Sequence, residues 1–258
     1  MSGEARYLYC IAEERERIQL GGIGLEEKMV YTVPHRDIAA VVHSCSPVPY
    51  SSVNNALAKD WLLEHSYVID QAMKTFGTVL PFSFDVIIKG GDEAIRCWLK
   101  QNYEGLRNEL KRFENKAEYA VQIFYDYDTY VSRVLSIDHD LISLEEKIDK
   151  HSKGKAYLLR RNLDLKIKDA VSSDVKRQAD LFGLEIRSIA DEVRTQEKVS
   201  FVPEKYRDKK LMASFSCLIL RDKVDQFGLA LEKINSLDGL AVRFTGPWAP
   251  FSFVNMEG

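Results

Sequence analysis

The sequence predicts an α+β fold of two domains, each a ferredoxin-like variant with an antiparallel sheet and helices on one face. Three observations support this prediction. Residues 1–125 follow the order strand, strand, strand, helix, strand, helix, strand. A charged helical region at about 140–197 comes next, and the chain ends as strand, helix and strand. Helices on one face of a small sheet are typical of α+β domains. We therefore expect domains at 1–125 and 126–258, the second carrying an inserted helical hairpin or arm.

The composition suits a soluble globular protein. The length of 258 residues slightly favours two domains, and 45% hydrophobic residues are enough for two cores. The net charge of -3 gives no general attraction to nucleic acid or to an anionic membrane. No apolar run approaches the roughly 20 residues that span a bilayer, and the first residues lack the pattern of a signal peptide. The four cysteines form no Cys-x-x-Cys pair, which favours reduced cytosolic thiols.

The first strands are predicted from short apolar runs. Tyr7–Ala12 is apolar on both faces, as expected of a central strand. A charged, glycine-containing stretch follows and is expected to form a loop. Met29–Val33 and Ile38–Val42 are two more strands, separated by a turn that contains Pro34. Ser44–Ser52 is rich in serine and proline and is expected to be a connection.

A helical period then replaces the strand period. Apolar residues recur at three- and four-residue steps from Asn54 to Phe76, and Gly77 is a natural stop for this helix. Val79–Ile88 is predicted as one strand, with an irregularity at Pro81 near its start.

A second long helix and a strand complete the first predicted domain. Asp92 is a plausible N-cap for the helix, which carries an apolar stripe to Phe113. Ala117–Tyr125 then alternates strictly between apolar residues and Glu118, Gln122 or other polar positions. This pattern predicts an antiparallel strand with one exposed face.

The middle of the chain is charged and carries no convincing strand between about 126 and 200. Ser143–Glu146 fits a capping box and predicts a helix start there. Gly154 interrupts the pattern, and apolar stripes then continue to Val193, with Gly183 as a weak point. Two or three helices with a narrow apolar seam indicate a hairpin that packs on a domain or projects from it. Pro203 ends this region.

The C-terminal part is predicted as a strand at Leu211–Leu220, a helix at Val224–Leu237 and a strand that begins at Leu240. Gly246–Pro250 breaks the last strand, because proline donates no ladder hydrogen bond. Alternation resumes at residues 251–254. A tryptophan between two prolines closes a core, makes a contact surface or does both, and a role in the core is favoured.

No residue pattern identifies an enzyme. The five histidines show no metal-ligand spacing, and His65 is best explained as a residue that packs its helix. Asp85 lies in an apolar strand without an identifiable catalytic partner, so a carboxylate at a strand end or edge is the better explanation. The basic residues between Lys147 and Arg161, which include Lys150, are diluted by acidic ones and lack interleaved aromatics. A solvated helix face is favoured over a nucleic-acid site there.

The C-terminal run Arg243–Val254 closely resembles the end of the gas vesicle protein family GvpF/GvpL, which typically reads Thr-Gly-Pro-Trp-Pro-Pro-Tyr before Phe-Val. Other segments fall in family order, among them Tyr7–Tyr9 and residues 154–158. The matching residues that we single out are Gly246, Pro247, Trp248, Pro250 and Phe253 of this run and Leu80, Pro81, Phe82 and Phe84 of an earlier strand. The chain departs at Ala249 and Phe251, which replace Pro and Tyr, and at Asp85, where the family usually has Gly.

The resemblance implies a non-enzymatic minor structural component or assembly factor that binds the small hydrophobic shell protein during gas vesicle formation. It implies no cofactor and a location in the cytoplasm before assembly and at the gas vesicle afterwards. Expected partners are the shell protein and other gas vesicle accessory proteins, with neither nucleic acid nor a lipid membrane, and the chain alone is expected to be a monomer. The signature residues are expected to be chiefly structural.

Two alternatives stay open at this point. A small-molecule enzyme or ligand-binding module could enclose a pocket between sheets, with a polar site around Asp85 or His65. A nucleic-acid binder is disfavoured by the net charge and by the lack of stacking platforms.

Overall fold

The structure is a computed structural model that describes residues 3–51, 55–148, 153–197 and 202–254. Lys150 of the basic cluster lies outside these ranges. Contacts divide the chain into two compact units, one of residues up to Glu118 together with those from Gly246, the other of Tyr119–Thr245. The last segment of the chain is therefore grouped with the N-terminal unit, whereas the sequence places it in the C-terminal domain. The domain boundary after residue 125 stays a prediction.

The first unit is built on a sheet with strand order β2-β3-β4-β1-β5, in which β6 also pairs with β1. Its strands are β1 (Ala5–Ala12), β2 (Gln19–Gly21), β3 (Val30–His35), β4 (Ile38–Cys45), β5 (Val79–Pro81) and β6 (Ile87–Lys89), and its α-helices are α1 (Asn55–Phe76) and α2 (Asp92–Arg112). Strand β1 pairs antiparallel with β4 on one side and with β5 and β6 on the other. All eight of its residues are buried, which confirms the predicted central strand.

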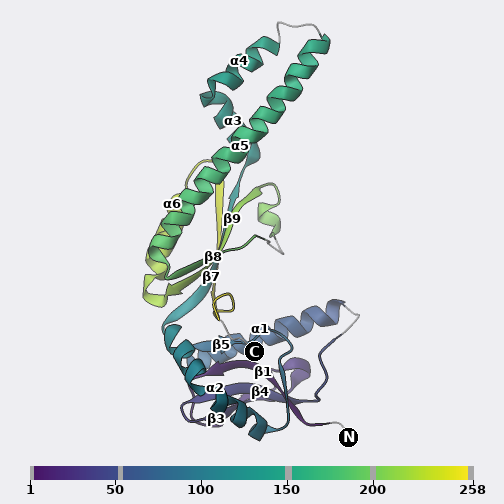
Figure 1. The fold of residues 1–258 in the computed structure, drawn as a ribbon, viewed down its shortest axis with the longest axis vertical. Coiled ribbons are helices and arrows are strands. Elements are labelled where there is room, and N and C mark those ends of the chain that lie inside the picture. Colours follow the sequence, from purple (N-terminus) through teal and green to yellow (C-terminus); the bar gives the residue numbers. More distant parts are fainter. Residues whose placement is uncertain (1–2, 52–54, 149–152, 198–201, 255–258) are drawn as a thin grey trace. The chain divides into compact units, whose positions relative to one another are not determined.

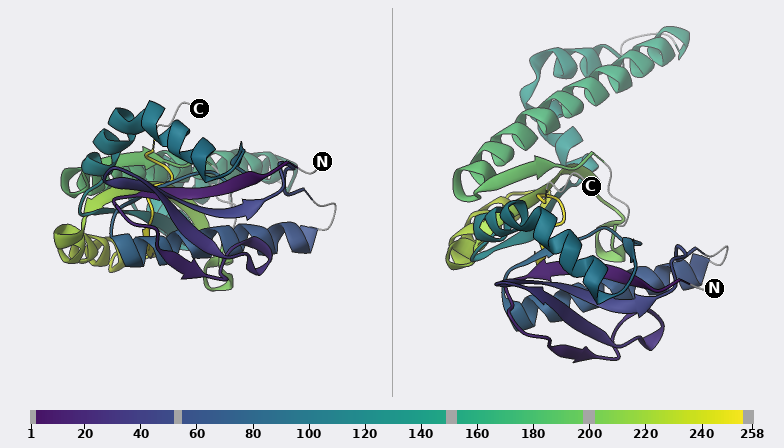
Figure 2. Two further views of the ribbon diagram at one scale, coloured as in Figure 1. Left: turned by 90° about the horizontal axis from the view of Figure 1, so that it is seen from below. Right: turned by 60° about the horizontal axis from the view of Figure 1, so that its bottom comes forward.

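Helices α1 and α2 cover opposite faces of this sheet (Figure 2, left). Side chains alternate between the faces of β1, so Tyr7 reaches His65 of α1 whereas Arg6 reaches Asp92 of α2. The prediction of helices on one face is therefore wrong for this unit. The physical reason lies in β1, whose two apolar faces both need to be covered.

The predicted strand at Val79–Ile88 is interrupted in the structure. Strand β5 pairs with Cys10–Ala12 and β6 pairs with Ala5–Tyr7, so both lie along the same neighbour, β1. Between them the chain turns at Asp85, which has a φ of 71°. The predicted loop before Met29 also differs, since it contains the short strand β2 and the 3-10 turn η1 (Leu25–Glu27).

Asp92 is the first residue of α2 and not its N-cap, which is Gly91. Its carboxylate instead joins the helix to the sheet. Oδ1 accepts from Arg6 Nε at 2.7 Å and from the Tyr31 hydroxyl at 2.8 Å, and Oδ2 accepts from Arg17 at 2.5 Å. Burial opposes ionisation, but these hydrogen bonds outweigh it and lower the pKa of Asp92.

The second unit has a sheet with strand order β10-β7-β9-β8 and a helical hairpin (Figure 1). Its strands are β7 (Lys116–Tyr125), β8 (Glu192–Thr195), β9 (Lys210–Leu220) and β10 (Leu240–Trp248), its helices are α3 (Tyr127–Ile137), α4 (His139–Ile148), α5 (Lys153–Ile189) and α6 (Val224–Asn235), and the short 3-10 turns η2 (Glu204–Tyr206) and η3 (Arg221–Lys223) flank β9. Helix α5 packs on β9 and α6 with its C-terminal part, while α3 and α4 lie along the rest of it. The ferredoxin-like character of this second unit stays a prediction, whereas the first unit departs from it because helices cover both faces of its sheet.

Several details of the second unit differ from the sequence-based expectations. Helix α4 starts after Asp138, whose carboxylate accepts from the backbone of residues 140 and 141, so Ser143–Glu146 does not start a helix. Helix α5 runs unbroken through Gly183, and β8 lies in the region where no strand was expected. Strand β10 continues through Trp248 and contains a cis peptide bond before Pro247. Residues 251–253 then form turns, where a resumed strand was expected.

Two further properties concern the whole described chain. None of its helices combines the length and the apolar character that crossing a bilayer requires. The four cysteines, Cys10, Cys45, Cys97 and Cys217, are free thiols.

Replacing Asp92 by alanine should lower the free energy of unfolding by about 3 kcal/mol, because the buried Arg6 loses its main partner inside the fold. Glu93→Ala is the matched control, since Glu93 lies in the same helical turn and is exposed. This control should change stability by less than about 0.5 kcal/mol. Urea-induced unfolding measures both values, and equal losses would contradict the anchoring role of Asp92.

Candidate functional site

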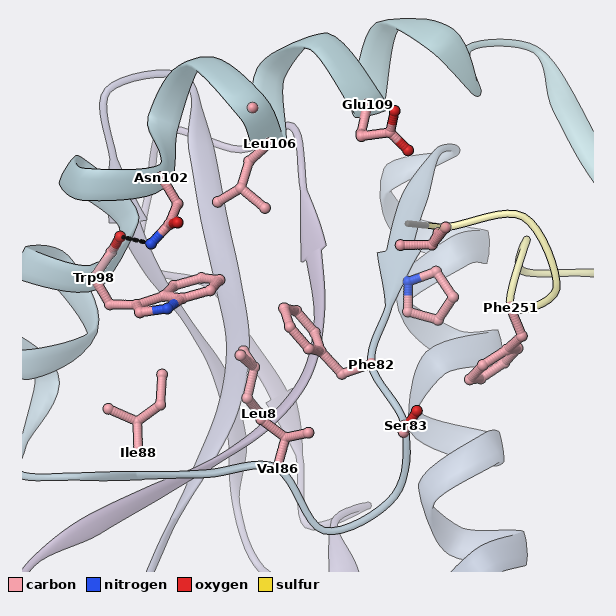
Figure 3. A pocket seen from close by; sticks show the side chains of 13 residues that line it. Leu8, Phe82, Ser83, Val86, Ile88, Trp98, Asn102, Leu106, Glu109 and Phe251 are labelled. Atoms are coloured by element: carbon pink, nitrogen blue, oxygen red, sulfur yellow. Dashed lines mark hydrogen bonds between the residues drawn. The ribbon is translucent and has the colours of Figure 1, made fainter. Parts of the chain in front are cut away.

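An apolar pocket of about 510 Å³ lies on the α2 side of the first unit (Figure 3). Its floor comes from the sheet, one wall from α2 and the opposite wall from the C-terminal segment. The lining residues are Leu8, Pro81, Phe82, Ser83, Val86, Ile88, Trp98, Asn102, Gly105, Leu106, Glu109, Phe251 and Val254. All of them belong to the first unit. The volume is in the range of sites that bind ligands or the side chains of a partner.

The wall from α2 follows the helical period. Trp98, Asn102, Leu106 and Glu109 are three or four residues apart and therefore share one side of the helix. The Trp98 ring packs edge to face on Phe82, with 5.8 Å between the ring centroids. The Asn102 amide donates to the Trp98 carbonyl at 2.9 Å, so it fixes its own position within the helix (Figure 3).

The C-terminal segment is held on the first unit by burial and by a buried carboxylate. Ala249 belongs to the core on the α1 side of the sheet, and Phe253 is fully buried. Glu118 accepts from the backbone N–H of Ser252 at 2.8 Å and from its hydroxyl at 2.5 Å. Glu118 is 7% exposed, so the prediction that its side of the strand faces water is wrong; Gln122, which accepts from Arg243, is buried as well.

The two signature segments meet at this pocket. Pro81 and Phe82 line it from one side, and Phe251, which follows Pro250, lines it from the other. Among the remaining signature residues, Leu80, Pro250 and Phe253 are buried, while Gly246 and Pro247 are exposed. Phe84 packs against Tyr7 and His65 on the α1 side.

Trp248 is 44% exposed, whereas the sequence favoured a core plug at this position. Its neighbours Ala249 and Pro250 are the buried residues, so they anchor the segment and leave the indole accessible. No sequence pattern points to Glu118, Gly105 or Glu109, because each looks like an ordinary strand or helix residue.

A buried aromatic and histidine network lies on the α1 side of the same sheet. The backbone N–H of Asp85 donates to the Tyr7 hydroxyl at 2.9 Å, and this hydroxyl lies 3.0 Å from His65 Nδ1. His65 Nε2 is 3.1 Å from the carbonyl of Phe82. A carbonyl can only accept, which assigns the proton to Nε2 and leaves Nδ1 to accept from Tyr7.

A second chain of the same design runs beside the first. The backbone N–H of Leu25 donates to the Tyr9 hydroxyl at 3.0 Å, and this hydroxyl lies 2.8 Å from His43 Nδ1. His43 Nε2 is 3.1 Å from the Tyr50 hydroxyl. Burial lowers the pKa of His43 to about 4 and also lowers that of His65, so both imidazoles are neutral near pH 7. Burial raises the pKa of Tyr50 to about 12.

Of the residues considered for an enzyme, His65 is buried in the core and Asp85 is half-buried beside it. His65 and Asp85 are brought together in one network, but neither lines the apolar pocket. The Asp85 carboxylate accepts from the backbone N–H of Tyr50 at 2.9 Å, which is a structural role. Among the described residues, no three His, Cys, Asp or Glu side chains are placed to hold a metal ion.

The two neutral histidines predict a loss of stability in acid. Below a pH of about 6.5 the unfolded chain takes up protons at His43 that the folded protein, with a pKa of about 4, does not. Stability contributed by His43 should be complete above pH 6.5 and fall by on the order of 3 kcal/mol as the pH drops to about 4. Urea unfolding between pH 7 and pH 4 measures this loss.

The control variants isolate the contribution of His43 from that of the carboxylates. His43→Asn should be less stable at pH 7 but lose less stability in acid, because the titrating group is gone. His139→Gln changes an exposed histidine and should keep the acid sensitivity of the wild type. Parallel pH curves for the wild type and His43→Asn would rule out this assignment.

Asp85 stands where a positive φ is required, so its replacements should rank in a defined order. Asp85→Gly loses the hydrogen bond to Tyr50 but relieves the backbone, and its stability should stay within about 1 kcal/mol of the wild type. Asp85→Ala loses the hydrogen bond and keeps the strain, and it should be destabilised by about 2 kcal/mol. Thermal or urea unfolding checks this order, and an alanine variant as stable as the glycine variant would refute it.

Comparison with known proteins agrees with the resemblance seen in the sequence. The family model described as gas vesicle synthesis protein GvpL/GvpF matches residues 5–255. Gas vesicle protein L1 of Halobacterium salinarum is 30% identical over 252 residues, which are 96% of this chain and 89% of that protein. Gas vesicle protein L of Haloferax mediterranei is 27% identical over 242 residues, 93% of this chain and 75% of that protein.

Two solved structures share the fold. The crystal structure of gas vesicle protein GvpF from Anabaena has a TM-score of 0.77 at 20% identity and covers 99% of this chain and 100% of its own. The crystal structure of GvpF from Microcystis aeruginosa has a TM-score of 0.66 at 17% identity, and the match covers 98% of this chain and 99% of that chain. The predicted family is confirmed by the match along almost the whole chain. The chain belongs to the GvpL/GvpF family of gas vesicle proteins.

Proposed function

We propose that this protein is a non-enzymatic minor structural component or assembly factor that binds the small hydrophobic shell protein during gas vesicle formation. Membership of the family connects the protein with gas vesicle formation. The observation that supports a binding role is the apolar pocket where the two signature segments meet. A shell subunit with one water-averse face needs a partner that covers this face until the subunit joins the wall.

Exposed apolar side chains on both units support this role. In the first unit Phe251 borders the pocket and is 43% exposed, and Trp248 lies three residues before it. In the second unit Leu158 and Leu165 are exposed on α5, two turns apart on one side of the helix. We infer that the first unit and the helical hairpin both provide surface for partners.

The proposal includes the cell biology that the family implies. The protein would be cytoplasmic before assembly and at the gas vesicle afterwards, a monomer on its own, and a partner of other gas vesicle accessory proteins. It would bind neither nucleic acid nor lipid membrane, in keeping with its net charge of -3. We also keep the proposal of two domains joined near residue 125, the second of them a ferredoxin-like variant.

A small-molecule site is the second candidate, and the volume of the apolar pocket favours it. Glu109 is the one ionisable side chain among the described residues of the lining. Acid–base catalysis needs a positioned group of suitable pKa and usually a partner for it, which this lining does not supply. The pocket therefore fits apolar binding better than a reaction.

Co-purification with the shell protein tests the proposed function. The full-length wild type, expressed together with the shell protein, should retain it on an affinity resin. Phe251→Lys with Trp248→Lys should weaken retention through the first unit, and Leu158→Lys with Leu165→Lys through the hairpin. Leu229→Lys on α6, also an exposed leucine, is the matched control and should retain the shell protein as the wild type does.

Vesicle counts in cells that lack the native gene provide a second readout. Complementation by the wild type and by Leu229→Lys should restore gas vesicles, whereas the two double variants should restore fewer. The binding role would be wrong if the wild type failed to retain the shell protein, or if neither double variant weakened retention.

A further inference from the structure

Gly105 has no structural reason to be a glycine. It lies inside α2, where glycine makes the helix less stable than alanine would. A Cβ atom at this position would meet no atom of the described residues within 4 Å, and the backbone φ is helical. The residue lines the apolar pocket next to Leu106. Because Gly105 has no side chain, the surface of α2 is open at this point of the pocket. Another chain can approach the helix backbone closely there.

Glu109 lies one helical turn after Gly105 and puts a negative charge at the rim of the pocket (Figure 3). A single nitrogen of Arg112 donates to its two oxygens at 3.1 and 3.3 Å. A carboxylate offers about four acceptor positions, so a second cation can bind while Arg112 stays in place. The rest of the lining is apolar or uncharged, and the wall opposite α2 carries the exposed ring of Phe251.

We propose that this pocket receives one or two bulky apolar side chains of the shell protein from a segment that also carries Lys or Arg. The segment passes over Gly105, its apolar side chains lie between Phe82, Trp98 and Phe251, and its cation pairs with Glu109. The proposal rests on the proposed function and specifies the site and the sequence character of the partner segment.

Three physical arguments support this occupant. A central apolar anchor in a pocket with a charged rim is the usual anatomy of a binding hot spot. A volume of about 510 Å³ exceeds that of one aromatic side chain, so two neighbouring anchors on a helix or strand fit. Glu109, the single acidic residue in the described part of the lining, selects a cation by charge complementarity and disfavours an acidic segment.

Gly105→Leu tests the pocket without weakening the fold. Leucine is a good helix former, so the melting temperature of the full-length variant should stay equal or rise. The added side chain blocks the approach to the helix, and affinity for overlapping synthetic peptides that cover the shell protein should fall about tenfold or more. Gly228→Leu on α6 is the matched control, because a Cβ there also meets nothing within 4 Å, and it should bind as the wild type does.

Glu109→Gln tests the cation. Binding of the best peptide should weaken about fivefold at low salt, and the remaining affinity should depend less on salt than that of the wild type. Glu104→Gln removes the same charge from an exposed position of α2 outside the lining and should leave binding unchanged. The peptides that bind the wild type should combine bulky apolar residues with Lys or Arg.

The outcomes separate this inference from the proposed function. If the wild type does not retain the full shell protein, the proposed function is wrong and this inference falls with it. If retention is intact but Gly105→Leu binds the peptides as the wild type does, only the pocket assignment is overturned. Equal binding by Glu109→Gln and the wild type, or selection of acidic peptides, overturns the assignment of a basic segment. Loss in both variants with intact controls supports the inference.

Discussion

The burial of β1 on both faces is the constraint on which the first unit depends. A strand with apolar side chains on both sides needs a cover on each, and α1 and α2 supply them. As a result, the two faces of the same sheet carry different kinds of side chains. The α1 side carries buried hydroxyls and imidazoles that satisfy one another, whereas the α2 side carries the Asp92 ion pairs and the open apolar pocket. The hydrogen bonds of Tyr7 and Tyr9 to the two histidines hold the first side together, and incomplete packing makes the second side available.

The C-terminal segment depends on the same strand, although it comes from the far end of the chain. Strand β5 is the edge of the sheet next to β1, and the segment supplies residues to both sides there: Ala249 on the α1 side, Phe251 and Val254 at the pocket. Glu118 fixes this segment through two hydrogen bonds to Ser252. A buried carboxylate without such donors would be destabilising. Glu118 therefore needs Ser252 as its donor, and the C-terminal segment needs Glu118 to hold it in place. The two signature segments thus define one site because both are bound to the edge of one sheet.

Elements that depend on local sequence patterns could be predicted. The central strand, the α1 helix with its stop at Gly77, and the strands β3, β4, β7 and β9 follow from periodicity. What it missed depends on partners distant in the chain. Glu118 was expected to be exposed because its partner Ser252 is far away in the sequence. Asp92 was expected to be a helix cap because its partners Arg6 and Tyr31 lie on strands distant in the chain. Trp248 was expected to be buried, but burial is decided by how the neighbouring Ala249 and Pro250 are anchored. The pocket itself could not be predicted, since its lining comes from four separate segments of the chain.

Gly105 shows how a site can be distinguished from a packing defect. A defect in a core lowers stability without a compensating gain, and replacement by a larger residue fills it. At Gly105 the space lies at the mouth of a pocket, and the glycine weakens a helix that would be more stable with almost any other residue. A residue that destabilises its own helix or strand is expected at positions where function, and not folding, determines which amino acid is present. Asp85 is the opposite case, since its unusual backbone is explained by bonds to Tyr7 and Tyr50 within the core. The strained Asp85 therefore serves the fold. Gly105 differs from Gly228, the equally open glycine of α6, because it lines the pocket, and this position connects it to the partner.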